Sequence, residues 1–316
     1  MDRFQSIDAF VRVAEATSFV EVSRQLGVSK SVVTSRVQQL EEFVGASLFH
    51  RSTRSVRLSE IGQVYYRECA DLISRANELV DQMRESRGSP TGTLRIHALP
   101  GFVLGHLAHL LNKFQDRYPG ISIDLVVNDA VIDPVREGFD CALQIFPPSS
   151  EGLVERRLFP VRRIFCASPS YLENHPPIVE PEDLIQHRLG LYSRYPSRDK
   201  WVFNGRNRQV MLDLKPNLRT NSVHLLRDFA VDGGGIVCIP TVVAADEILA
   251  GRLKLLLCSY RLSEFWLSAV YPPTQRNMFK LRLILDELVE NFSGTPPWDM
   301  ALANHGLSFE DFDSVR

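Results

Sequence analysis

The stretch that decides the fold runs from residue 18 to residue 62 and reads SFVEVSRQLGVSKSVVTSRVQQLEEFVGASLFHRSTRSVRLSEIG. Ser18 and Glu21 match a capping box, in which the hydroxyl accepts the Glu21 amide proton and the carboxylate reaches back to the Ser18 amide. The helix that begins there ends at Gly27, a residue suited to the left-handed backbone that terminates helices. Ser29 is a good N-cap for the next helix. The stretch therefore predicts two short helices joined by a tight turn.

Apolar residues at helical spacing extend this pattern in both directions. A first helix is predicted by Phe4, Ile7, Phe10, Val11 and Ala14. The helix after Ser29 has an apolar face formed by Val33, Val37, Leu40 and Val44. Three short helices, of which the last two meet at a turn with glycine, form the helix-turn-helix layout, whose second member can lie in a DNA major groove.

Local charge supports a DNA-binding reading of this layout. Between residues 24 and 57 the chain carries six Lys or Arg residues and only two Glu, a local excess of about four positive charges. The whole chain is slightly acidic, with 36 Lys and Arg against 38 Asp and Glu. Because the chain as a whole is slightly acidic, any DNA-binding surface must be local. A basic face that merely contacts solvent remains the alternative.

Length and composition bound the rest of the molecule. At roughly 150 residues per domain, 316 residues predict about two globular domains. The first 20 residues contain five charged side chains, which leaves no apolar core for a signal peptide. The five cysteines include no Cys-x-x-Cys pair, so a disulfide framework or zinc knuckle is not expected. We expect a cytoplasmic protein without membrane segment, metal or cofactor.

A long amphipathic helix is predicted from Glu60 to about Arg87. Its apolar stripe recurs at three- and four-residue steps, and at 1.5 Å per residue the helix reaches roughly 40 Å. This length suits a seam between two copies of the chain, although a helix packed only on its own domain remains the alternative. The predicted seam residues are Ile61, Tyr65, Leu72, Ala76, Leu79 and Met83.

Beyond a Gly-Ser-Pro-Thr-Gly break at residues 88–92, strands alternate with helices. Short apolar runs such as LRIHA and ISIDLVV are separated by helical patterns, which indicates an open α/β sheet with crossover connections. We expect a short helix ending at Gly138, a hairpin from WVFNG and NRQVML, and a last helix over about residues 277–292. About 200 residues of this pattern suit two subdomains.

The residues from Phe10 to Gly62 resemble the winged helix-turn-helix of the LysR-type transcriptional regulators. The resemblance is carried by FVRVAE, by the entry VS, by the exit QLEEFVGASLFHR and by the closing LSEIG. TGTLRI, EGFDCALQI, CASPSYL and DGGGIVCIP resemble, more loosely, the family's effector domain. Val22 and Ser23 replace two usual alanines, and Lys30-Ser31 replaces a common Gln-Pro, so the resemblance implies the fold but not a base preference.

The resemblance implies a fold of the class α + α/β. A winged helix-turn-helix with a long linker helix would precede a two-lobed, periplasmic-binding-protein-like (type 2) effector domain. The expected parts are a DNA-binding domain at 1–58, a linker and dimerisation helix at 59–87, a hinge at 88–93, an effector domain at 94–293 and a tail at 294–316. Lobe I would span about 94–162 and 267–293, and lobe II about 163–266. We expect the Pro-rich, acidic tail to be a flexible or loosely docked extension.

The start of the third helix and the wing are the predicted DNA contacts. A helix N-terminus favours phosphate, and Lys30 can donate to guanine. Arg51, Thr53 and Arg54 suit a wing that grips the DNA backbone. The predicted DNA-binding residues are Ser29, Lys30, Ser31, Thr34, Arg36, Arg51, Thr53 and Arg54. The family implies a homodimer or homotetramer on double-stranded DNA with an interrupted palindrome, and contact with RNA polymerase.

A cleft between two α/β lobes would close on a small effector at strand carboxyl ends and helix starts. The candidate lining residues are Leu99, Pro100, Gly101, Phe102, Asn128, Asp129, Ile145, Phe146, Tyr192, Ser193, Asn221, Ser222 and Val223. Family members that bind carboxylates often have Ser or Thr where this chain has Pro100 to Phe102. A less polar or smaller effector is therefore expected.

Signals for an enzyme fail on inspection. The glycines at 233–235 lack the G-x-G-x-x-G spacing and follow a helix. His106 and His109 have no third ligand nearby, and no nucleophile elbow or P-loop occurs. We expect no catalytic residue. A metabolic enzyme or solute-binding protein with an accessory helical domain is the alternative, supported only by the α/β part, and a ligand-free architectural DNA protein is a weaker one.

Overall fold

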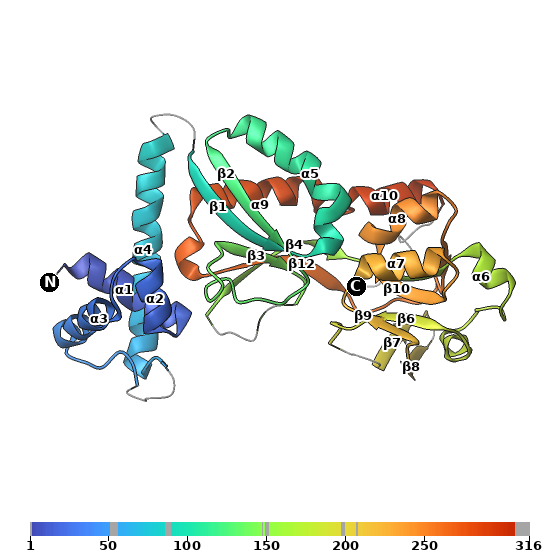
Figure 1. Cartoon of the computed structure of the whole chain (residues 1–316), viewed down its shortest axis with the longest axis horizontal. Coiled ribbons are helices and arrows are strands. Elements are labelled where there is room, and N and C mark those ends of the chain that lie inside the picture. Colours follow the sequence, from blue (N-terminus) through green and yellow to red (C-terminus); the bar gives the residue numbers. More distant parts are fainter. Residues whose placement is uncertain are drawn as a thin grey trace.

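The computed structural model describes residues 2–50, 56–85, 90–146, 148, 152–196, 200–206 and 208–306, with only the backbone of residues 77, 78 and 80–85. An N-terminal helical domain, a long helix and two α/β lobes follow one another along an elongated molecule (Figure 1). Within these residues, none of the helices combines the length and the apolar character that a bilayer crossing requires.

The N-terminal domain begins with α1 (Arg3–Ala16), α2 (Phe19–Gln25) and α3 (Lys30–Val44). Both predicted N-caps are confirmed, because Ser18 Oγ accepts the Glu21 amide at 3.2 Å and Ser29 Oγ accepts the Val32 amide at 3.4 Å. The Glu21 carboxylate pairs with Arg24 at 3.4 Å. The helices therefore form the predicted helix-turn-helix around a core of buried apolar side chains.

A wing follows α3. Gly45 ends the helix at φ +77°, and Glu41 Oε1 accepts the amides of Leu48 (2.7 Å) and Phe49 (3.2 Å). Phe49 then forms an antiparallel bridge with Leu58. These contacts fix the base of the wing, while its tip, residues 51–55, lies outside the described residues.

The long helix α4 (Glu60–Glu85) has two apolar faces. One face is buried against the N-terminal domain and contains Cys69, Ala70 and Ile73. The other face is exposed and contains Ile61, Val64, Leu72 and Leu79. Of the predicted seam, Ile61, Leu72 and Leu79 thus lie on the exposed face. Tyr65 packs on Phe10 (ring centroids 5.7 Å apart), Ala76 is half-buried, and the Met83 side chain lies outside the described residues.

The first lobe is a five-stranded mixed sheet with the order β2-β1-β3-β12-β4. Its strands are β1 (Gly92–Ala98), β2 (Ile121–Val127), β3 (Cys141–Gln144), β4 (Val154–Val161) and β12 (Phe265–Tyr271). The helices α5 (Pro100–Arg117) and α9 (Phe279–Phe292) cover it. The short helix η2 (Pro273–Gln275) lies between β12 and α9 and contacts α4.

The second lobe is a sheet with the order β11-β5-β10-β6-β9. Its strands are β5 (Arg163–Ala167), β6 (Leu189–Tyr192), β9 (Leu218–Thr220), β10 (Ile236–Pro240) and β11 (Lys254–Leu256). The predicted hairpin is confirmed as β7 (Lys200–Asn204) and β8 (Gln209–Asp213). The helices of this lobe are α6 (Pro169–Glu173), η1 (Pro181–Gln186), α7 (Val223–Val231) and α8 (Thr241–Leu249).

Helix α5 is broken after its first turn. Leu104 has a ψ of 116° and Gly105 a φ of +95°, so the turn that begins at Pro100 is separate from the rest of the helix. The positive φ favours glycine at position 105. The remainder of α5 packs Leu107, Leu110 and Phe114 into the core of the first lobe.

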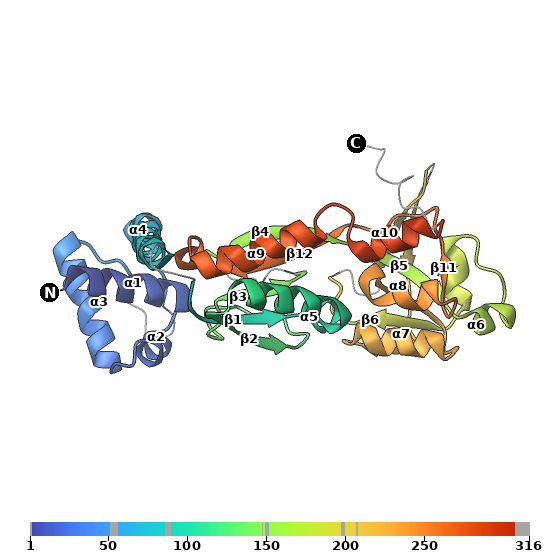
Figure 2. The ribbon, with the colours of Figure 1, turned by 90° about the horizontal axis from the view of Figure 1, so that it is seen from above.

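Three sequence-based expectations are wrong in detail. Residues 134–138 form a turn and not a helix, and Gly92 and Thr93 belong to β1 and not to the hinge. The segment after residue 293 is not a loose extension over its first part: Pro297–Asn304 form helix α10, which packs on α8. Figure 2 shows α9 over the first lobe and α10 over the second, along the same side of the molecule. Residues 307–316 lie outside the described residues.

The N-terminal domain contacts the first lobe through Glu15 of α1. Tyr66 of α4 donates a hydrogen bond to Glu15 Oε1 (3.2 Å), and Thr274 of η2 donates to both carboxylate oxygens (3.0 and 3.2 Å). Burial raises the pKa of Glu15 from 4.5 to about 7, against the opposing effect of these hydrogen bonds. The carboxyl group of Glu15 therefore joins three elements from two parts of the molecule.

Candidate functional site

The start of α3 presents polar side chains to solvent. Ser29, Lys30 and Ser31 are exposed, and the Ser29 and Ser31 hydroxyl groups lie 2.8 Å apart. Thr34 is half-buried and donates to the Lys30 carbonyl at 2.9 Å. The Lys30 ammonium group therefore stands at the positive end of the helix dipole with neighbouring hydroxyl groups, an arrangement that suits contact with phosphates and base edges.

Arg36 is held more tightly than its neighbours. Its guanidinium donates to Gln5 Oε1 of α1 at 2.6 Å. The structure also exposes Val32, Ser35, Gln38 and Gln39 on the same helix, which the sequence analysis did not select. Val32 is the informative one, since an exposed valine on such a helix can contact a thymine methyl group. The signal that could have found it is the absence of Val32 from the apolar face of α3.

Of the wing, the base lies within the described residues. Its predicted contacts, Arg51, Thr53 and Arg54, lie outside the described residues. Arg57, at the base of the wing, is exposed, and its carbonyl accepts the His50 amide at 2.8 Å. A basic side chain is therefore exposed at the base of the wing.

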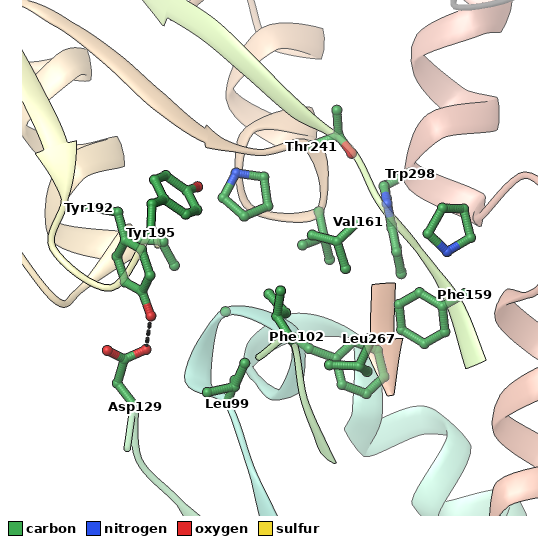
Figure 3. A pocket seen from close by; sticks show the side chains of 16 residues that line it. Leu99, Phe102, Asp129, Phe159, Val161, Tyr192, Tyr195, Thr241, Leu267 and Trp298 are labelled. Carbon is green, nitrogen blue, oxygen red and sulfur yellow. Dashed lines mark hydrogen bonds between the residues drawn. The ribbon is translucent and has the colours of Figure 1, made fainter. Parts of the chain in front are cut away.

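A second candidate site lies between the two lobes (Figure 3). Its cavity has a volume of about 40 Å³, room for about three water molecules. Its walls are mostly apolar and aromatic. The lining residues are Leu99, Gly101, Phe102, Asp129, Ile145, Phe159, Pro160, Val161, Tyr192, Tyr195, Val223, Pro240, Thr241, Val242, Leu267 and Trp298. Because ligand pockets commonly measure about 300–1,000 Å³, a typical metabolite would require the lobes to move apart.

The polar groups of this cavity are few and face one another. The Tyr192 hydroxyl donates to Asp129 Oδ1, as the dashed line in Figure 3 shows. Arg194 lies 3.5 Å from the other oxygen of Asp129. Burial raises the pKa of Asp129, while the Tyr192 hydroxyl and Arg194 oppose the rise. The buried Tyr195 hydroxyl has no hydrogen-bond partner among the described residues. The polar end of the cavity therefore offers hydrogen-bond acceptors and tyrosine hydroxyl groups.

The structure brings seven of the predicted lining residues together at the cavity: Leu99, Gly101, Phe102, Asp129, Ile145, Tyr192 and Val223. They come from the ends of β1, β2, β3 and β6 and from the starts of α5 and α7. This is the arrangement that the rule of strand carboxyl ends predicts.

The other six predicted residues do not line the cavity. Asn128 Oδ1 pairs with His97 Nε2 at 2.9 Å, and the ring of Phe146 packs on Phe265. Ser222 caps α7 by accepting the Leu225 amide at 3.2 Å. The remaining three occupy turns next to the cavity: Pro100 in the first turn of α5, Ser193 after β6 and the exposed Asn221 after β9.

The sequence did not predict nine of the lining residues, and all of these except Tyr195, which follows β6, come from other elements. Phe159, Pro160 and Val161 lie at the end of β4, and Leu267 lies on β12. Pro240, Thr241 and Val242 join β10 to α8, and Trp298 belongs to α10. His106, expected on the helix surface, is half-buried and packs on Trp298 with tilted rings whose centroids are 4.9 Å apart.

A winged helix-turn-helix, a long helix and a two-lobed α/β domain around a cavity define a DNA-binding regulator with a separate ligand-binding domain. The family models agree with this class: "Bacterial regulatory helix-turn-helix protein, lysR family" matches residues 4–63, and "LysR substrate binding domain" matches residues 87–293. The chain belongs to the LysR family of transcriptional regulators.

Characterised relatives match nearly the whole chain. The HTH-type transcriptional regulator CrgA of Neisseria meningitidis is 30% identical over 288 residues, which cover 90% of this chain and 96% of CrgA. The regulator PtxR of Pseudomonas aeruginosa is 28% identical over 288 residues, which cover 91% of this chain and 92% of PtxR.

Solved structures agree. A structure of CrgA aligns with 90% of this chain and 98% of the CrgA chain, with a TM-score of 0.56 and 29% sequence identity. The Vibrio cholerae virulence activator AphB covers the same shares with a TM-score of 0.56 at 25% identity. The predicted fold class is thus confirmed, and the family and these relatives are regulators and not enzymes.

Proposed function

We propose that this regulator binds double-stranded DNA with the exposed start of α3 in the major groove and the wing on the backbone. The observation that carries the proposal is the exposed cluster of Ser29, Lys30 and Ser31 at the N-terminus of α3. Lys30 would donate to guanine O6 or N7, and Val32 would contact a thymine methyl group. Thr34 and Arg36 would complete the contacts of α3, and Arg51, Thr53 and Arg54 those of the wing.

We further propose a homodimer joined along the exposed face of α4. Leu72 and Leu79 are 50% and 59% exposed and seven residues apart, which is the repeat of a coiled coil. A two-fold pair would present two copies of α3 to an interrupted palindrome. Association of two dimers and contact with RNA polymerase are expectations that rest on the family, as is action in the cytoplasm, where the DNA lies.

For the effector we propose a small, weakly polar molecule without a carboxylate. The cavity is apolar along most of its wall, and Asp129 would repel an anion. A ligand that donates a hydrogen bond to Asp129 or accepts one from Tyr192 or Tyr195 fits the polar end. Effector binding would shift how the dimer sits on DNA, and nothing in the proposal requires a catalytic residue, metal or cofactor.

The test is binding to the DNA upstream of the gene, measured by fluorescence anisotropy at several salt concentrations. A sequence-specific regulator should bind this fragment at least about a thousandfold more tightly than a scrambled fragment, with a steep salt slope. Lys30→Ala should cost about 1–3 kcal/mol on the specific fragment and little on the scrambled one. Arg57→Ala, the matched control on the wing base, should weaken both fragments similarly. Equal losses from both variants on both fragments would contradict the assignment.

A further inference from the structure

The C-terminal helix α10 follows the residues matched by the family's effector domain, which end at residue 293. It is firmly docked: Trp298 is 5% exposed, and Asp299 and Leu302 are fully buried. Its main neighbour is α8 of the second lobe. The helix therefore lies beyond the residues that the family model matches and is a buried part of the second lobe.

Trp298 connects this helix to the first lobe. Its ring lies 5.5 Å from that of Phe292 on α9, 5.8 Å from that of Phe159 on β4 and 4.9 Å from that of His106 on α5. These are distances at which aromatic rings attract one another. A helix that sits on the second lobe thus places one side chain among three elements of the first.

A buried ion pair fixes the helix at the connection between the lobes. Arg162, the single residue between β4 and β5, lies on the passage of the chain from one lobe to the other. Its guanidinium donates to Asp299 Oδ2 at 2.6 Å. Burial raises the pKa of Asp299, and Arg162 opposes this rise. A buried charge without its partner is costly, so the pair holds α10 against the connection between β4 and β5.

Trp298 also forms part of the cavity wall. It lines the cavity with Thr241 and Val161, at the end away from Asp129 and Tyr192 (Figure 3). We propose that Trp298, supplied by the C-terminal extension, closes this end of the effector cavity and sets the size of the molecule that the cavity accepts. This inference rests on the proposed effector site and adds the residue that limits it.

The experiment enlarges the cavity and fills it again with a known probe. In the full-length protein, Trp298→Ala replaces an indole group by a methyl group, and apolar cavities of about 150 Å³ bind small aromatic molecules. Indole at ten times its dissociation constant should raise the melting temperature of the variant by roughly 3 °C. The unaltered chain should respond less, because its cavity is only about 40 Å³.

Trp266→Ala is the matched control. Trp266 precedes the cavity-lining Leu267 on β12, and adjacent strand residues point to opposite faces of a sheet. This variant should show no stabilisation by indole. If Trp298→Ala does not fold, Trp298→Leu keeps an apolar contact with Phe292 and is tested with benzene in the same way.

A folded Trp298 variant without a response to its probe, or with one no larger than that of Trp266→Ala, would overturn the inference. DNA affinity, measured with and without indole, separates this result from a failure of the proposed function. If indole stabilises Trp298→Ala and changes its DNA affinity, both proposals gain support. If indole stabilises the variant without changing DNA affinity, Trp298 closes the cavity but the cavity does not control DNA binding.

Discussion

The contact between the N-terminal domain and the first lobe should depend on pH through Glu15. Because burial raises its pKa to about 7, the carboxyl group holds a proton in the folded chain at pH values where it has lost that proton in the unfolded chain. Its contribution to the free energy of unfolding is complete below pH 4.5, declines between pH 4.5 and about 7, and is lost above that. The other groups facing it are Arg12 of α1, Tyr66 of α4 and Thr274 of η2.

The magnitude follows from the pKa. A rise from 4.5 to about 7 corresponds to an upper limit of about 3 kcal/mol, since each pKa unit is worth about 1.4 kcal/mol. Glu15→Gln keeps the size and one acceptor oxygen for Tyr66 and Thr274 but cannot ionise. The variant should therefore lose this part of the pH dependence and be more stable than the unaltered chain at pH 8.

Scanning calorimetry at pH 5 and pH 8 measures the effect. Between these pH values the free energy of unfolding should fall by up to about 2.5 kcal/mol more for the unaltered chain than for Glu15→Gln, since part of the effect is already lost at pH 5. Glu21→Gln on α2, where the carboxylate pairs with Arg24 at the surface, is the control and should behave like the unaltered chain. An identical pH dependence for the unaltered chain and Glu15→Gln would refute the reasoning.

Three further outcomes are expected. Leu72→Glu should convert the proposed dimer to a monomer in sedimentation velocity, whereas exposed Asp71→Glu should leave it assembled; a Leu72→Glu dimer as stable as that of the unaltered chain would argue against the α4 seam. Gly62→Ala should lower the melting temperature of the N-terminal domain, since an added Cβ would lie 2.0 Å from the Leu48 carbonyl oxygen; an unchanged melting temperature would contradict this clash. Tyr192→Phe should destabilise the chain by about 1–3 kcal/mol in thermal unfolding, because Asp129 loses a buried hydrogen bond; a loss confined to low pH would show that the protonated carboxyl is the group affected.

The N-terminal fold was predictable because its signals are local. Ser18 and Ser29 act as N-caps, Gly27 has the positive φ that its position predicts, and the predicted apolar face of α3 is largely buried. The predicted apolar face of α1 is only partly right, because Phe10 and Val11 are buried but Phe4 is exposed. Exposed polar residues opposite a buried stripe make such helices visible in sequence.

The elements that sequence did not reveal are those with little polar surface. Helix α8 has five buried residues among nine and no side-chain cap, and β12 is an apolar run buried over most of its length. Periodicity does not separate buried helices from buried strands. Helix α10 was hidden by Pro296-Pro297, yet Pro297 occupies the first turn, where a missing amide proton costs nothing.

About half of the cavity lining could be predicted, because those residues follow from the topology of the sheet and the others depend on tertiary packing. Residues at strand carboxyl ends, such as Leu99 and Tyr192, follow a topological rule. Thr241 and Trp298 reach the cavity only because α8 and α10 pack where they do, and that placement depends on tertiary contacts such as the Asp299–Arg162 pair.

The break in α5 separates the turn that lines the cavity from the rest of the helix. The turn that carries Gly101 and Phe102 is separated at Leu104 and Gly105 from the part of the helix anchored in the first lobe. Phe102 on this turn packs on Phe159 of β4 and Phe292 of α9, with ring centroids 5.1 and 5.4 Å apart, so a ligand that displaces the turn has to break these contacts. A molecule larger than the resting cavity that enters past this turn would therefore act directly on β4 and α9 of the first lobe.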